Sequence, residues 1–271
     1  MMYRNNKNYL KLAYYDPNTG LPNHESLKYF LENLLKGNKW DGAIMMLNFS
    51  HQRNLSLLYG SDYTEKVFKE IALKIIEVFD KDCTIFRTGK DDIVIFSEAF
   101  DSEDGICQGL GRAKDLFNKE TFSDQNIYMP VAIGIAKMAE ERDPEHLIKK
   151  ALIAMSRVQD NGRVTYQYFN SEMGAAIERE DFIEKEILQA IRDEEAGIEG
   201  SIYVLFQPQV DAGSLKITGF ETLARMKSKT LGNVSPVEFI EIAERKRLMI
   251  PLTKLIMKKA SLFIKSMNEA P

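Results

Sequence analysis

Apolar and polar residues follow two different periods along the chain, and these periods predict its helices and strands. Apolar residues spaced three and four apart predict amphipathic helices. Short apolar runs between Gly, Pro, Asn or Asp predict strands. In order, the first 170 residues predict a helix at 3–14, a helix at 23–37, a strand at 43–47, a helix at 67–79, a hairpin at 83–97, a helix at 103–119, a strand at 127–136, a helix at 143–159 and a strand at 164–169. This alternation predicts an α/β fold with a mixed sheet, because the hairpin requires an antiparallel pair.

Residues that start and stop helices support this order. Asn23 is a favourable N-cap, and Gly37 follows the last apolar residue of the same stretch. The run Asp143-Pro144-Glu145 combines an N-cap, a proline at the first helical position and an acid in the first turn. Asn161-Gly162 is a stop for that helix.

The remainder of the chain predicts a different arrangement. A long charged helix at 171–195 has the character of a connector between domains. Strand-like runs at 202–210 and 215–225, separated by Asp211-Ala212-Gly213-Ser214, predict a second hairpin. Ser235-Pro236-Val237-Glu238 has the pattern of a capping box that starts a helix. A last helix is predicted at 251–267.

The turn of the first hairpin contains Gly89, Lys90, Asp91 and Asp92. Two adjacent acids at a hairpin tip suit a divalent cation and its phosphates, because hard cations take oxygen ligands. Gly and Asp are also common turn residues for conformational reasons alone, so a solvated turn is the competing interpretation.

Composition narrows the function classes. A formal net charge of -4 offers no basic field for nucleic acid. The two cysteines, Cys83 and Cys107, form no disulfide framework and fit a reducing cytoplasm. No apolar run reaches the length of a membrane span, and the polar first 12 residues lack the apolar region of a signal peptide. The three histidines have no metal-ligand spacing.

Four motifs occur in a defined order over about residues 10–170. They are Asp16-x-x-Thr19-Gly20-Leu21-Pro22-Asn23, Arg87-x-Gly89-Lys90-Asp91-Asp92-Ile93, Val131-x-Ile133-Gly134-Ile135-Ala136 and Asn161-Gly162-Arg163. Together they resemble the GGDEF domain, the family that makes cyclic di-GMP from two GTP molecules. The resemblance implies a sheet flanked by helices, with the signature on the hairpin.

The chain departs from this family where the chemistry belongs. The signature's second glycine, where the nucleotide approaches the backbone, is Lys90, whose side chain would fill that space or contact phosphate. A metal-binding acid is kept as Asp91, and the following glutamate is shortened to Asp92. The family's second metal-binding acid lies at the end of the first strand, and Asn48, a neutral amide, stands at that position here. Since a two-cation site needs negative ligands, this change weakens metal binding.

The nucleotide-recognition positions differ too. By resemblance, Ser56 and Glu65 stand at the two positions that recognise guanine in the family. Gln159 stands where the family has a lysine that contacts phosphate, and the arginine that follows this position is kept as Arg163. The product-inhibition motif aligns with 80–83 and lacks its arginine. The resemblance implies a cyclase-like domain without cyclase activity, which either still binds GTP or serves as a regulatory or structural module.

Three motifs follow the long helix. They are Phe206-Gln207-Pro208-Gln209-Val210, Gly219-Phe220-Glu221-Thr222-Leu223-Ala224-Arg225 and Ser235-Pro236-x-x-Phe239-Ile240-x-x-Ala243-Glu244. They resemble the start of an EAL domain, the family that hydrolyses cyclic di-GMP to pGpG on a TIM-like barrel. We therefore expect a degenerate GGDEF domain at 1–170, a connecting helix at 171–200 and the first part of an EAL domain at 201–271.

The second resemblance assigns roles to a few residues. Glu221 stands at the position of a ligand for Mg²⁺ or Mn²⁺, with Thr222 in place of the signature's alanine. Gln207, Leu223 and Arg225 stand at positions that contact cyclic di-GMP, and a guanidinium suits phosphate. Taken without the surrounding motifs, Glu221 is better interpreted as an acid on the surface at the end of a strand.

A barrel of this kind takes about 250 residues, so we expect this chain to hold only its first strands. The later metal-binding acids and the catalytic lysine and glutamate would lie elsewhere in a longer protein, and this chain alone would be inactive. A partial barrel leaves apolar strand edges and helix faces exposed. Pairing with a second copy, as a homodimer, is the alternative way to cover them. The leading hypothesis is a bacterial cyclic di-GMP phosphodiesterase regulated by its GGDEF domain. A GTP-binding diguanylate cyclase and a non-catalytic receptor or scaffold are the alternatives.

Overall fold

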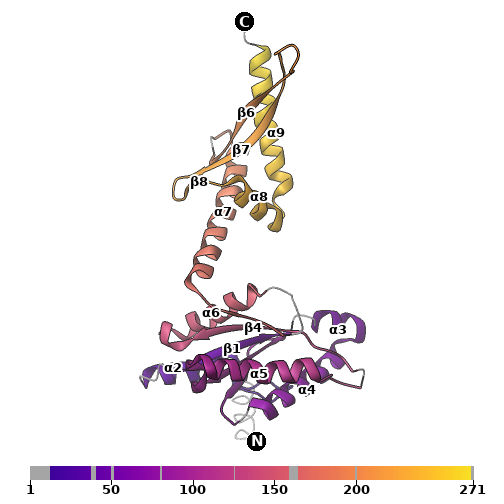
Figure 1. Cartoon of the computed structure of the whole chain (residues 1–271), viewed down its shortest axis with the longest axis vertical. Coiled ribbons are helices and arrows are strands. Elements are labelled where there is room, and N and C mark those ends of the chain that lie inside the picture. Colours follow the sequence, from indigo (N-terminus) through magenta and orange to yellow (C-terminus); the bar gives the residue numbers. More distant parts are fainter. Residues whose placement is uncertain are drawn as a thin grey trace, which may run out of the picture. The chain divides into compact units, whose positions relative to one another are not determined.

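The structure is a computed structural model that describes residues 13–37, 41–49, 52–79, 81–124, 126–158, 164–198 and 200–269. The chain divides into two compact units, residues 1–174 and 175–271 (Figure 1). Most of the predicted helix at 3–14 lies outside the described residues. Among the described helices, none combines the length and the apolar character that crossing a membrane requires.

The described part of the first unit is an α/β sandwich around a five-stranded sheet in the order β2-β3-β1-β4-β5. Strand β1 pairs antiparallel with β3 on one side and with β4 on the other. Strand β2 pairs antiparallel with β3, and β5 pairs parallel with β4. The mixed sheet is therefore confirmed. The bounds of the strands are β1 Ala43–Asn48, β2 Thr84–Arg87, β3 Asp92–Ser97, β4 Val131–Lys137 and β5 Val164–Tyr168.

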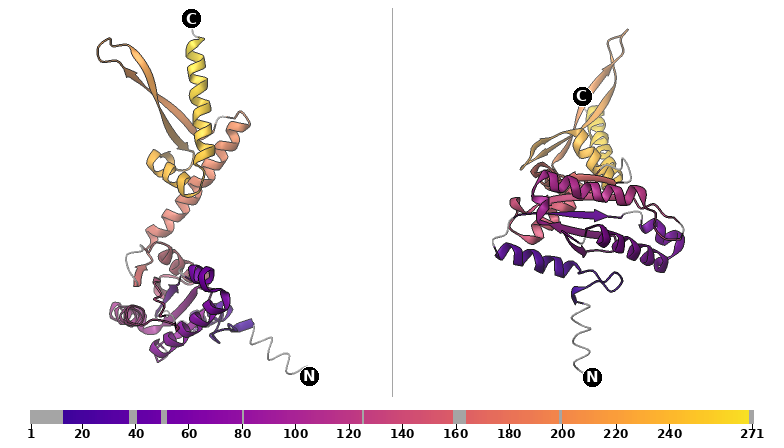
Figure 2. Two further views of the ribbon diagram at one scale, coloured as in Figure 1. Left: turned by 90° about the vertical axis from the view of Figure 1, so that its right-hand side faces the viewer. Right: turned by 60° about the horizontal axis from the view of Figure 1, so that its bottom comes forward.

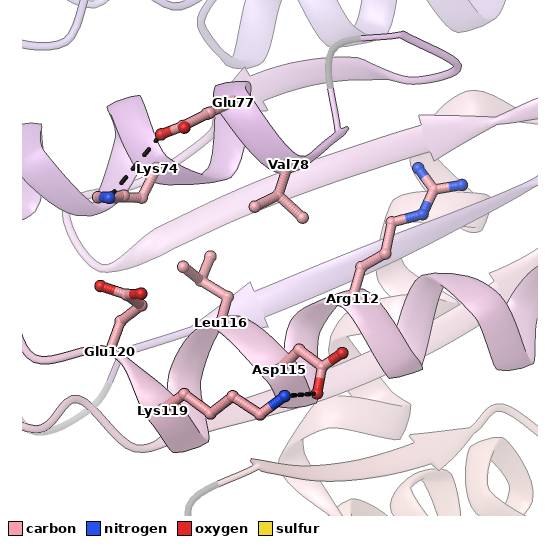
Figure 3. Close-up of a pocket in the computed structure, with 8 residues that line it drawn as sticks. All are labelled: Lys74, Glu77, Val78, Arg112, Asp115, Leu116, Lys119 and Glu120. Atoms are coloured by element: carbon pink, nitrogen blue, oxygen red, sulfur yellow. Dashed lines mark ion pairs between the residues drawn. The ribbon is translucent and has the colours of Figure 1, made fainter.

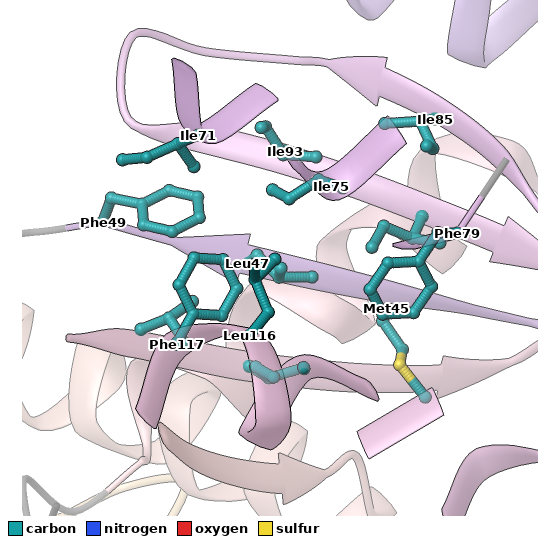
Figure 4. Packing of buried hydrophobic residues seen from close by; sticks show 14 of the residues in the cluster. Met45, Leu47, Phe49, Ile71, Ile75, Phe79, Ile85, Ile93, Leu116 and Phe117 are labelled. Atoms are coloured by element: carbon teal, nitrogen blue, oxygen red, sulfur yellow. The ribbon is translucent and has the colours of Figure 1, made fainter. Parts of the chain in front are cut away.

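Helices cover both faces of this sheet because its central strands are apolar on both sides. On β1, Met45 and Leu47 pack with α4 and α5, whereas Ile44 and Met46 pack with α2 and α6 (Figure 4 shows part of the first of these clusters). The bounds of the helices are α2 His24–Lys36, α3 Gln52–Tyr59, α4 Ser61–Phe79, α5 Glu103–Lys119 and α6 Pro144–Ser156, with short 3-10 turns at η1 Glu98–Asp101 and η2 Met138–Glu140.

Two helix caps were predicted correctly. The side chain of Asn23 accepts a hydrogen bond from the backbone of Ser26, and Gly37 ends α2. Asp143 caps α6 through the backbone N–H groups of Glu145 and His146. The strand predicted at 127–136 is shorter, since β4 begins at Val131. Pro130 precedes that strand and cannot donate a ladder hydrogen bond, which accounts for the later start.

In the second unit, a hairpin and three helices surround a separate core. The hairpin consists of β6 Ile202–Val210 and β7 Ile217–Ser228, and a short strand, β8 Gly232–Val234, pairs with the end of β7. The helices are α7 Ser171–Glu195, α8 Pro236–Arg245 and α9 Met249–Asn268 (Figure 2). Ile183 and Ile187 of α7 pack in the core with Phe239 of α8 and Leu252 of α9.

The capping box predicted at Ser235 is wrong. The hydroxyl of Ser235 makes no cap hydrogen bond, although α8 starts at Pro236 as expected. Glu238, the acid of that motif, instead forms a two-point ion pair with Arg179 of α7, at 2.6 and 3.0 Å. A guanidinium that offers two parallel donors competes well against a single backbone N–H.

Candidate functional site

The first hairpin brings the predicted acids together at the end of β1. In the register of β1 and β3, Asn48 lies opposite Asp92, and the Nδ2 of Asn48 donates a hydrogen bond of 2.7 Å to Oδ1 of Asp92. The backbone N–H of Phe49 donates to the carbonyl of Asp91 at 2.9 Å. The amide of Asn48 thus occupies one oxygen of Asp92.

The electrostatics of the tip reflect two neighbouring carboxylates. The pKa of Asp91 is raised, first by burial and then by the negative charge of Asp92, while Lys90 and Arg87 act in the opposite direction. A divalent cation would relieve this repulsion, but it takes several oxygen ligands. The described residues contain no group of three or more His, Cys, Asp or Glu side chains that could hold a metal. Among the described residues, the tip brings together the carboxylates of Asp91 and Asp92 and the amide of Asn48.

Arg87, the last residue of β2, lies under this tip with only 5% of its surface exposed. Its Nη1 donates to Oδ1 of Asp16 at 2.9 Å, and its Nη2 donates to the backbone carbonyl of Lys90 at 3.1 Å. Both nitrogens lie 3.3–3.4 Å from the carboxylate of Glu65. The guanidinium also lies 4.3 Å from the ring centroid of Phe68. One cation therefore joins the loop at Asp16, helix α4 and the signature turn.

Glu65, a predicted guanine-recognition position, belongs to this internal network. Besides Arg87, its Oε2 accepts a hydrogen bond of 2.5 Å from Nδ2 of Asn18. These contacts engage the carboxylate of Glu65 within the fold. Ser56, the other predicted position, lies half-buried on α3. The predicted phosphate contact Arg163 and its neighbour Gln159 lie outside the described residues, as does Asp80 of the product-inhibition motif.

In the second unit, the register of the hairpin places the predicted ligand residues on one face. Gln207 lies opposite Glu221, and Leu223 and Arg225 follow at every second position of β7. Because side chains alternate along a strand, all four share one face of the β6–β7 pair. Gln207 and Glu221 are exposed, and Leu223 and Arg225 are half-buried. We call this surface the ligand face.

The ligand face offers hydrogen-bonding groups and a single carboxylate. Nη1 of Arg225 donates to the carbonyl of Ala224 at 2.8 Å. Glu221 is a hard oxygen ligand of the kind that Mg²⁺ and Mn²⁺ prefer. In the part of the chain that the structure describes, no further acids join it in a group able to hold a metal. Among the described residues, Glu221 is therefore the carboxylate that this face presents.

A surface cavity of about 370 Å³ between α4 and α5 is less suited to a ligand (Figure 3). Four of its charged side chains are paired within a helix: Lys74 lies 3.8 Å from Glu77, and Lys119 lies 2.8 Å from Asp115. Arg112, on its wall, lies 3.6 Å from Asp82. Charges that are already paired give little affinity for an added phosphate.

Two contributors were missed at the level of sequence. Arg87 lies within the signature motif, but its neighbours in the sequence do not reveal its partners Asp16 and Glu65, because these come from distant segments. Phe263 on α9 stacks on Phe206 of the hairpin, with ring centroids 3.7 Å apart. Its position within a helical apolar pattern gives no indication of which strand it meets.

Comparison with known proteins identifies both parts of the chain. Residues 13–165, more than half of the 271 residues, match the family described as diguanylate cyclase, GGDEF domain. Residues 184–271 match the EAL domain. These matches agree with the two resemblances found in the motifs.

Curated relatives extend along nearly the whole chain. The bifunctional diguanylate cyclase/cyclic di-GMP phosphodiesterase MucR of Pseudomonas aeruginosa is 26% identical over 262 residues, covering 95% of this chain and 37% of MucR. The cyclic di-GMP phosphodiesterase NbdA of the same organism is 20% identical over 264 residues, covering 96% of this chain and 33% of NbdA. The chain spans about a third of the length of these relatives.

Solved structures share the fold. LapD of Vibrio cholerae, solved as its S helix, GGDEF and EAL domains bound to c-di-GMP, has a TM-score of 0.55 at 12% identity and covers 98% of this chain and 61% of its own. The GGDEF domain of TpbB (YfiN) from P. aeruginosa has a TM-score of 0.55 at 16% identity and covers 60% of this chain and 99% of its own. The chain belongs to the GGDEF family and continues into part of an EAL domain.

Proposed function

We propose that this chain is part of a cyclic di-GMP phosphodiesterase whose GGDEF domain, at 1–170, regulates the enzyme and makes no cyclic di-GMP itself. The observation that carries the proposal is the ligand face of the hairpin. Gln207 and Glu221 lie opposite each other there, and Leu223 and Arg225 follow on the same side. The names of MucR and NbdA, both cyclic di-GMP phosphodiesterases, support the same substrate.

Each residue of the ligand face has a separate task in this proposal. The guanidinium of Arg225 binds a phosphate of cyclic di-GMP, because it offers a planar pair of donors. Gln207 hydrogen-bonds the dinucleotide, and Leu223 contacts a base or sugar through its apolar surface. Glu221 is one ligand of Mg²⁺ or Mn²⁺, which would activate water for hydrolysis. We assign no step of hydrolysis to this chain, since its described residues supply one metal ligand.

Binding of cyclic di-GMP to this chain tests the ligand face. By titration calorimetry with Mg²⁺ present, Arg225→Ala should weaken binding about tenfold to a hundredfold, the loss of a charge-assisted pair. Glu241→Gln is the matched control, because Glu241 is an exposed acid of the same unit on α8. Equal affinity of Arg225→Ala and the control would contradict the proposed role. Absence of cyclic di-GMP hydrolysis by the full-length protein with Mg²⁺ and with Mn²⁺ would overturn the phosphodiesterase assignment.

The absence of cyclase activity is proposed from the signature turn. Asn48 supplies an amide in place of an acid and hydrogen-bonds Asp92, and Glu65 is engaged by Arg87. Incubation with GTP and Mg²⁺ should therefore give no cyclic di-GMP. Its formation would favour the alternative of an active diguanylate cyclase that uses Asp91, Asp92 and Arg163.

The same chain can be tested for the remaining alternatives. Heat released on titration with GTP, without turnover, would support a GTP-binding regulatory domain. Binding of neither GTP nor cyclic di-GMP would leave the scaffold role. A homodimer, the alternative way to cover the strands of the second unit, is a separate proposal, and sedimentation velocity on this chain over a range of concentrations decides it.

A further inference from the structure

The reverse side of the β6–β7 hairpin carries aromatic residues next to the ligand residues. Phe206 directly precedes Gln207, and Phe220 directly precedes Glu221. Since side chains alternate along a strand, both rings lie on the side opposite the ligand face. The aromatic pair therefore lies behind the point where Gln207 and Glu221 meet across the strands.

Both rings contact one residue of α9. The ring of Phe263 stacks on that of Phe206, with centroids 3.7 Å apart and planes inclined by 9°. It also meets Phe220 in an edge contact, with centroids 5.5 Å apart and planes at 86°. A flat ring makes both contacts at once, face to one partner and edge to the other. An aliphatic side chain cannot reproduce this geometry.

This contact is distinct from the core of the unit. The buried cluster contains Ile202 and Met226, which lie at the other end of the hairpin, and it does not include Phe263. In the left view of Figure 2, the hairpin and α9 diverge toward their far ends. The three rings connect α9 to the half of the hairpin that carries Gln207 and Glu221.

We propose that Phe263 is a positioning residue for the ligand face, holding Gln207 and Glu221 in register through Phe206 and Phe220. The proposal rests on the proposed function in so far as the ligand is cyclic di-GMP. An antiparallel pair alone is a two-stranded ribbon, and such ribbons are marginally stable unless they pack on another element. Phe263 supplies that packing behind Gln207 and Glu221.

The first test measures the hairpin without ligand. In hydrogen exchange of the whole chain, Phe263→Leu should raise exchange of peptides 204–210 and 218–224 about tenfold, because local opening becomes easier. Exchange of 183–190 in the core should not change. Phe263→Tyr keeps the ring and should restore protection. Leu262→Ala is the matched control, since Leu262 is the neighbouring residue of α9 and 56% exposed.

The second test measures cyclic di-GMP affinity in the same variants. Phe263→Leu should weaken binding about tenfold, and Phe263→Tyr and Leu262→Ala should bind within about twofold of the unaltered chain. Unchanged exchange in Phe263→Leu, or equal losses in Phe263→Leu and Phe263→Tyr, would overturn the positioning role. If the unaltered chain binds no cyclic di-GMP, the ligand assignment fails, and exchange of the hairpin alone decides whether Phe263 holds it.

Discussion

Arg87 is a buried cation that connects residues distant in sequence, and Asp16 is its nearest acid at 2.9 Å. Burial raises the pKa of Asp16, but hydrogen bonds from Thr19 and from Arg87 outweigh it, so the pKa lies below its ordinary value. A lowered carboxyl pKa stabilises the fold above the unfolded pKa, and this contribution is lost as pH falls through the folded pKa.

Asp16→Asn tests this linkage. Near neutral pH, the variant should unfold about 1–2 kcal/mol more easily, the size of a charge-assisted hydrogen bond. The difference from the unaltered chain should shrink between about pH 5 and about pH 2, because the carboxyl of the unaltered chain becomes protonated. Denaturant unfolding at several pH values measures it. Asp41→Asn, at an exposed loop acid, is the control. A difference that stays constant with pH would exclude the charge of Asp16 as its origin.

Leu215 presents a backbone conformation that its side chain disfavours. Its φ is 56°, and 79% of the residue is exposed in the turn between β6 and β7. A left-handed conformation costs an L-residue about 1–2 kcal/mol, and glycine avoids most of this cost. Leu215→Gly should raise the free energy of unfolding by about 0.5 kcal/mol after its larger unfolded-state entropy is subtracted. Leu215→Ala removes the same exposed side chain, keeps the strain and should give no gain in urea unfolding.

Single residues also show where sequence reasoning succeeds. The caps at Asn23 and Asp143 were predictable because they depend on neighbours within three residues. The partners of Glu65 were not predictable, because Asn18 and Arg87 come from other segments. The same limit explains Glu238, whose local motif offered a backbone N–H while the fold offered Arg179.

At the scale of elements, β4 and α6 approach closely at Gly134. A Cβ there would lie 2.0 Å from the carbonyl oxygen of Ala151 and 2.5 Å from the backbone nitrogen of Met155. Gly134→Ala should therefore cost about 3 kcal/mol of stability, since α6 has to move away from the sheet. Gly111→Ala is the control of opposite sign: Gly111 lies within α5 with nothing within 4 Å of its Cβ position, so alanine should stabilise by about 0.5–1 kcal/mol. Denaturant unfolding that gives both variants the same sign would contradict this close approach.

The order and type of most elements followed from periodicity alone. The strand over β1 and the helix over α5 are predicted by apolar runs and helical spacing, which tertiary contacts then reinforce. The alternate packing of β1 onto two helix layers follows from its unbroken apolar run. The ring contact at Phe263 did not follow, because a helical pattern fixes the buried face of α9 without its partner on the hairpin.

At the scale of the whole molecule, the buried clusters of the two units are separate. Ile75 belongs to one of the two clusters described in the first unit and Ile187 to the cluster of the second, and both side chains are fully buried. Chains with separate cores depart from two-state unfolding. Thermal unfolding by calorimetry should therefore show two transitions. Ile75→Ala should lower the midpoint temperature of one transition and Ile187→Ala that of the other. In each case the unit that carries the substitution loses about 2–5 kcal/mol of stability. A single transition shifted equally by both variants would contradict this expectation.

The two transitions also locate cyclic di-GMP. A ligand that binds only the native state stabilises it by about 2.7 kcal/mol at a hundred times its Kd. If cyclic di-GMP binds the ligand face, it should raise the midpoint temperature only of the transition that Ile187→Ala affects, because Gln207 and Glu221 lie in the second unit. Arg225→Ala should abolish most of that shift, and Glu241→Gln should leave it unchanged. If cyclic di-GMP raised only the midpoint of the transition that Ile75→Ala lowers, the ligand would bind the GGDEF domain, and the assignment to the hairpin would be contradicted.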